Sequence, residues 1–129
     1  MILNRVWWGL GFFFVFAAIV ACLVPGDELP GAFEVNDKFS HLAGHGALAL
    51  WFSGLVPRRS WWKIWLLLLL LGTAIEFMQY FMHAGREGDP RDVLANTIGA
   101  LLGLGVGRLG VCRWPQLAAW LLGQRRISE

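Results

Sequence analysis

Long uninterrupted blocks of apolar residues decide what this chain can fold into. Four such blocks take up most of its 129 residues: Val6–Val24, Phe39–Val56, Trp61–Met82 and Val93–Val111. A helix needs roughly 20 mostly apolar residues to cross a bilayer, because each residue adds about 1.5 Å. Charged residues make up only 16% of the chain, against about 25% in a typical soluble domain. The sequence therefore predicts an all-α, polytopic membrane bundle of about four transmembrane helices, forming a single domain over residues 1–129.

The second block fits a membrane span least well. It is the shortest of the four and contains His41 and His45. Pro57 is expected to end it, and Asn36 or Asp37 to cap its start, because a side-chain oxygen can accept a hydrogen bond from a free backbone N–H there.

The basic residues predict the orientation of the bundle. Eight of the eleven Lys and Arg residues fall on one side: Arg5, Arg58, Arg59, Lys63, Arg108, Arg113, Arg125 and Arg126. Cytoplasmic loops are enriched in Lys and Arg. Both termini are therefore expected in the cytoplasm, with acidic loops 25–38 and 83–92 outside. The short tail 112–129 is expected to lie partly on the inner membrane surface.

The last three blocks each carry polar residues along one helical face. The three stripes are Asp37, His41 and His45; Glu76, Gln79 and His83; and Asp92, Asn96 and Gly99. Residues three or four apart share a face of a helix. An ionisable group in mid-bilayer costs about 2.5–3.5 kcal/mol on insertion scales, so these faces should turn inward. The predicted topology brings all three stripes together near the outer boundary.

This polar cluster is the predicted ligand-binding site. Its members are Lys38, His41, Glu76, Gln79, Arg86, Asp92 and Asn96. Arg86 is the leading candidate for contact with an anionic ligand, since its guanidinium fork suits phosphate or carboxylate, although it could instead form a salt bridge to Glu76 or Asp92. Glu76 is a candidate general acid or base. A structural role, hydrogen-bonded to Gln79 and Asn96, is the favoured alternative.

No metal or cofactor is expected. His41 and His45 share a helix face and could chelate a metal, but the sequence contains no helical His-Glu-x-x-His motif. Gly99, Gly103 and Gly107 are spaced by four, which predicts a seam where two helices approach closely.

The ordered set of polar residues resembles the VanZ-like family of small bacterial membrane proteins. The resemblance rests on Asp37-Lys38, His41, Glu76-x-x-Gln79, Arg86, Asp92, Asn96 and Gly99, between apolar blocks of matching length, and covers about residues 36–107. It implies a multi-pass protein of the bacterial inner (cytoplasmic) membrane. It also implies a link to the cell envelope and to glycopeptide (teicoplanin) resistance, but no defined reaction. His45 departs from the pattern, which tends to place an aromatic residue there.

Three functions are left open. The favoured one is an accessory protein that binds an anionic envelope component, such as a lipid headgroup or a lipid-linked precursor. The others are an intramembrane enzyme acting on such a lipid and a bundle whose polar network serves only its fold and partners. Membrane lipids are the expected partners, nucleic acid is not, and a homo-oligomer is an open alternative.

Overall fold

The computed structural model describes residues 2–24, 37–82 and 89–123, which form helices and no strands. This confirms the all-α prediction. The longer helices are α1 (Ile2–Leu23), α2 (Asp37–Ser53), α3 (Trp61–Met82), α4 (Pro90–Arg108) and α5 (Trp114–Leu121). Two 3-10 turns, η3 (Arg58–Ser60) and η4 (Val111–Arg113), precede α3 and α5.

Two helices are long and apolar enough to cross a membrane by length and composition, Leu3–Leu23 and Arg58–Met82. The segments Pro90–Arg108 and Val111–Leu121 meet this test only together, and they are bent by 74° relative to each other. α2 has 17 residues, which gives it about 26 Å, slightly less than a hydrocarbon core of roughly 30 Å. The described chain thus contains two or three candidate spans, and the arrangement with four spans stays a prediction.

The ends of two helices differ from those expected. α4 begins at Pro90 rather than Val93, because the Asp89 side chain caps it by accepting a hydrogen bond from Arg91 N at 2.8 Å and proline suits the first helical position. α2 ends at Ser53 rather than Val56. Its last turn tightens through i to i+3 bonds, from Gly54 N to Trp51 O and from Leu55 N to Phe52 O, ahead of Pro57.

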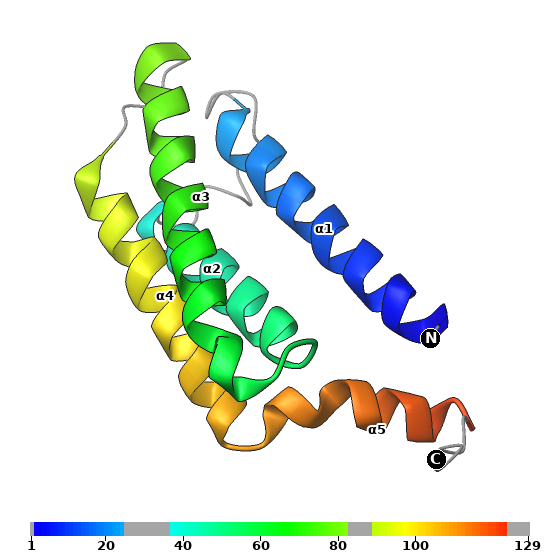
Figure 1. Cartoon of the computed structure of the whole chain (residues 1–129). Coiled ribbons are helices and arrows are strands. Elements are labelled where there is room, and N and C mark those ends of the chain that lie inside the picture. Colours follow the sequence, from blue (N-terminus) through cyan, green and yellow to red (C-terminus); the bar gives the residue numbers. More distant parts are fainter. Residues whose placement is uncertain (1, 25–36, 83–88, 124–129) are drawn as a thin grey trace.

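Three helices make the body of the bundle. α2, α3 and α4 lie side by side, and α1 leans against α2 and α3 (Figure 1). The most extensive packing is between α2 and α4. There, a Cβ on Gly99 would overlap the Leu42 carbonyl, and a Cβ on Gly103 would overlap that of Gly46. The predicted glycine seam is confirmed, and α2 is its partner helix.

The apolar core lies toward the end of the bundle where α2 and α4 end and α3 begins. Its buried members are Leu48, Ala49, Phe52, Trp61, Ile64, Leu68, Ala100 and Leu104. At the same end, Trp51 lies 4.4 Å from Trp114 and 6.0 Å from Trp7 between ring centroids, so α1, α2 and α5 meet there. Polar side chains occupy the other end of the three-helix body.

Candidate functional site

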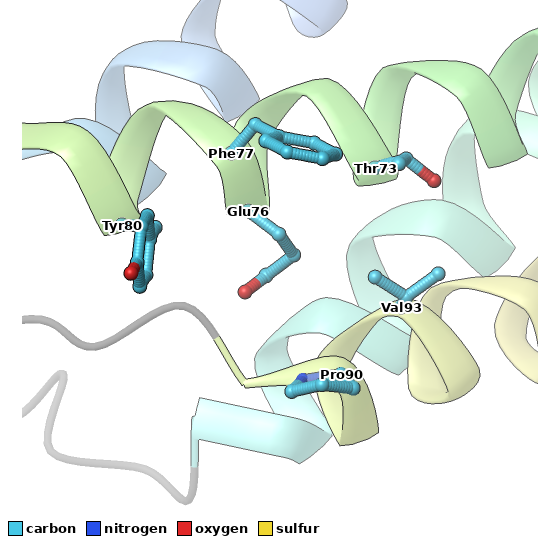
Figure 2. Close-up of a pocket in the computed structure, with 6 residues that line it drawn as sticks. All are labelled: Thr73, Glu76, Phe77, Tyr80, Pro90 and Val93. Atoms are coloured by element: carbon cyan, nitrogen blue, oxygen red, sulfur yellow. The ribbon is translucent and has the colours of Figure 1, made fainter.

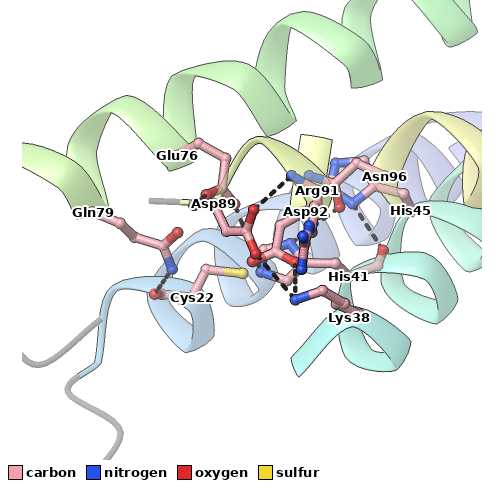
Figure 3. Close-up of polar contacts among 10 residues, drawn as sticks. All are labelled: Cys22, Lys38, His41, His45, Glu76, Gln79, Asp89, Arg91, Asp92 and Asn96. Carbon is pink, nitrogen blue, oxygen red and sulfur yellow. Dashed lines mark hydrogen bonds and ion pairs between the residues drawn. The ribbon is translucent and has the colours of Figure 1, made fainter. Parts of the chain in front are cut away.

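Polar side chains are buried where α2 begins, α3 ends and α4 begins (Figure 3). The buried members are His41, His45, Glu76, Gln79, Asp92 and Asn96, with exposed fractions from 0 to 6%. The described members of the three sequence stripes thus lie at one end of the three-helix body. Because helices α2, α3 and α4 each contribute, the cluster exists only in the assembled bundle.

Asn96 and His41 form the centre of the cluster. Asn96 is fully buried, and its Oδ1 lies 3.1 Å from His41 Nδ1. An amide oxygen can only accept a hydrogen bond, so the imidazole donates from Nδ1. Asn96 therefore holds the orientation of the His41 ring and receives the N–H of Nδ1.

Glu76 brings α3 into the cluster. Its Oε1 lies 3.8 Å from His41 Nε2, and its Oε2 accepts a hydrogen bond from the backbone N–H of Asp89 at 3.0 Å. The sequence had favoured Gln79 and Asn96 as its hydrogen-bond partners. That detail was wrong, because Asn96 faces His41 and the Gln79 amide points to another helix.

Gln79 instead ties α3 to α1, since its Nε2 donates to the carbonyl of Cys22 at 2.8 Å. His45 does not form the metal-binding pair with His41 that the sequence disfavoured, because its Nδ1 lies 3.2 Å from the His41 carbonyl and donates to it. The two histidines therefore do not direct their ring nitrogens at one common point.

Lys38 lies at the rim, with 46% of its side chain exposed. Its Nζ is 3.2 Å from Asp89 Oδ2 and 3.6 Å from Asp92 Oδ1. The Arg91 backbone N–H and the Lys38 ammonium lower the pKa of Asp89 below its usual range. Asp89 was missed as a site residue, although an Asp-Pro pair before an apolar block is a helix-start signal that could have found it.

Arg86, His83 and the side chain of Asp37 lie outside the part of the chain that the structure describes. The predicted ligand contact by Arg86 therefore stays a prediction. Of the predicted site residues that are described, His41, Glu76, Asp92, Asn96 and Lys38 come together and Gln79 stands at their edge.

A groove of about 310 Å³ adjoins the cluster between α3 and α4 (Figure 2). It is lined by Thr73, Glu76, Phe77, Tyr80, Pro90 and Val93. Phe77 and Tyr80 are more than half exposed, so the groove lies on the exposed surface of α3 and α4 and not in the interior of the bundle. Glu76 belongs both to its wall and to the buried cluster, which makes this carboxyl the link between an apolar groove and a polar interior.

The cluster also contains a set of metal-ligating groups. One ligand atom each from His41, Glu76 and Asp92 lies within 4.8 Å of the other two. This set takes one residue from each of α2, α3 and α4. The pair considered from the sequence, His41 and His45, comes from α2 alone.

Comparisons with known proteins identify the family of the chain. A family model described as VanZ/LLP1 matches residues 16–111, which include α2, α3, α4 and every residue of the buried cluster. No curated protein and no solved structure matches the chain.

Proposed function

The chain belongs to the VanZ/LLP1 family, and from that premise we propose that it binds an anionic, lipid-borne component of the bacterial cell envelope. In this proposal it is a multi-pass protein of the inner membrane with four spans, both termini in the cytoplasm and the polar cluster at the outer side. Its role is accessory, in envelope maintenance and glycopeptide (teicoplanin) resistance.

The observation that carries the proposal is the position of Glu76. This residue lines an apolar groove on the surface of α3 and α4 and at the same time reaches the buried cluster. A groove with apolar walls and one polar end suits an amphiphile, whose chain lies along the walls while its headgroup meets polar groups. A lipid headgroup or a lipid-linked precursor has this chemistry.

Charge supports an anionic headgroup. The side chain of Lys38 is half exposed at the rim of the cluster, and Arg86 follows α3 by four residues in the sequence. Arginine contacts phosphate through two parallel hydrogen bonds. We therefore place the headgroup at the rim, beside Lys38 and Arg86, rather than among the buried carboxylates.

The groove provides the test. Replacing Val93 by Phe fills it with a larger side chain, whereas the same change at the neighbouring Leu94, which is 59% exposed and does not line the groove, leaves it open. Mass spectrometry should find an anionic lipid retained by the purified wild type and by Leu94→Phe, and several-fold less in Val93→Phe. Teicoplanin susceptibility of cells carrying each variant should follow the same order. Equal lipid retention by both variants would show that the groove does not bind the lipid.

A second candidate function is an intramembrane enzyme acting on the same lipid. It is favoured by the carboxyl of Glu76, which faces His41 at 3.8 Å from the wall of the groove and could exchange a proton with a bound lipid. An enzyme would convert the added lipid to a product of different mass, and Glu76→Gln would stop the conversion. A binding protein would return the lipid unchanged.

A further inference from the structure

We infer that His41, Glu76 and Asp92 bind one divalent transition-metal ion between α2, α3 and α4 (Figure 3). Each helix supplies one side chain, and the three ligand atoms lie within 4.8 Å of one another. The exposed fractions of the three residues are 3, 6 and 3%. This inference concerns a cation in the interior and does not depend on the lipid proposed for the groove.

The hydrogen bond to Asn96 makes His41 suitable as a ligand. Because Nδ1 donates to Asn96 Oδ1 at 3.1 Å, Nε2 is the ring nitrogen left to bind an ion. Nε2 faces Glu76 Oε1 at 3.8 Å, which is beyond hydrogen-bonding distance. A metal ion between two such bases would bind both. Metal-binding histidines almost always donate their second ring N–H to an oxygen, as His41 does here.

Asp92 adds a buried carboxylate oxygen to the set. Its side chain is 4% exposed, and a charge removed from water is unfavourable unless it is compensated. Among the described residues the cation in contact with Asp92 is Lys38, which lies 3.6 Å away and closer to Asp89. Asp92 Oδ1 accepts no hydrogen bond from any described residue. A divalent ion would take this oxygen as a ligand and offset the charge of Asp92.

The donor set indicates the class of metal. One imidazole with two carboxylates suits Zn²⁺, Mn²⁺ or Fe²⁺, whereas Mg²⁺ and Ca²⁺ are held by oxygen ligands. In a tetrahedral zinc site with bonds of about 2.0–2.2 Å, the donor atoms are roughly 3.4 Å apart. The His41–Glu76 separation of 3.8 Å is near that value, and side-chain rotation can bring Asp92 closer.

Zinc binding by the purified chain tests the inference. The tag-free protein in detergent, stripped with EDTA, should bind one Zn²⁺ per chain by elemental analysis and titration calorimetry. His41→Gln, Glu76→Gln and Asp92→Asn should each weaken binding by about tenfold or more. His45→Gln is the matched control, because His45 is equally buried on the same face of α2 but is not one of the three ligands. It should bind zinc like the wild type.

The inference is overturned if the wild type takes up no stoichiometric zinc, if all three ligand variants bind normally, or if His45→Gln loses zinc to the same extent. Because a buried substitution can unfold the bundle, Co²⁺ added to the wild type gives a second measurement. Visible d–d bands without a thiolate charge-transfer band would support histidine and carboxylate ligands. A strong thiolate band would place the ion on Cys22 or Cys112 and refute the site.

Discussion

At the scale of single residues, a glycine sets the position of the most buried polar group. Gly72 on α3 faces Asn96 on α4, and a Cβ at residue 72 would lie 2.5 Å from Asn96 Nδ2. The absence of a side chain at residue 72 leaves the space that the amide occupies. The amide in turn holds the ring of His41, so one glycine helps to determine which histidine nitrogen faces Glu76.

We predict that Asn96→Leu destabilises the bundle by about 1–3 kcal/mol, because it leaves the buried His41 N–H without its acceptor. The adjacent Thr97 is the control, since its hydroxyl donates only to the Val93 carbonyl within the same helix. Thr97→Val should therefore change stability little. Thermal unfolding in detergent measures both, and an unchanged melting temperature for Asn96→Leu would show that the amide does not hold the cluster.

At the scale of helices, the close contact of α2 and α4 holds the site together. Lys38 and His41 come from one of these helices, and Asp92 and Asn96 from the other. The glycine seam permits backbone contact between them without side chains in the way. In lipid, packing of this kind is a main source of helix association, since there is little hydrophobic drive between apolar helices.

Gly103 and Gly105 offer a matched test of the seam. A Cβ at residue 103 would overlap the Gly46 carbonyl, whereas a Cβ at residue 105 meets nothing within 4 Å. We expect Gly103→Ala to cost about 1–3 kcal/mol through overpacking. Gly105→Ala should be neutral or slightly stabilising, because alanine favours helix more than glycine does. Similar melting temperatures for the two variants would contradict the seam.

Helical periodicity predicts much of this architecture. Spacings of three and four residues placed His41, Glu76, Asp92 and Asn96 on inward faces, and the structure buries all four. Periodicity predicts which face of a helix turns inward, but it does not predict which residue of a neighbouring helix that face contacts. That is why Gln79 was paired with Glu76, while the structure gives its amide a carbonyl of α1 as partner.

Features outside the repeating pattern were the harder ones to predict. Asp89 lies before the apolar block, yet it caps α4, contacts Lys38 and donates its backbone N–H to Glu76. The bend between α4 and α5 depends on Gly110, whose φ of 105° is a conformation that glycine adopts without strain. Neither role can be inferred from hydropathy.

At the scale of the whole molecule, the two ends of the bundle differ in chemistry. The cluster end holds Glu76, Asp89 and Asp92. At the opposite end Arg58 donates to the carbonyl of Arg108 at 3.4 Å, and indole rings from three helices meet. The distribution of basic residues predicts that the cluster end faces outward.

Cysteine labelling tests that orientation. With Cys22 and Cys112 replaced by alanine, Arg59→Cys should react with an impermeant thiol reagent only after the membrane is opened. Glu28→Cys, in the first predicted outer loop, should react in intact cells. Reaction of Arg59→Cys from outside would reverse the topology and move the cluster to the cytoplasmic side.

The pairing of His41 with Asn96 has a consequence for the order of synthesis. The two residues are 55 positions apart in the chain, so at about 5–20 residues per second the histidine is made roughly 3–11 s before its partner. Glu76 and Asp92 also follow later. During this interval α2 carries two histidines whose cluster is incomplete. The polar face of α2 therefore meets its partners only after α4 has been made, so the cluster is the last part of the three-helix body to be completed.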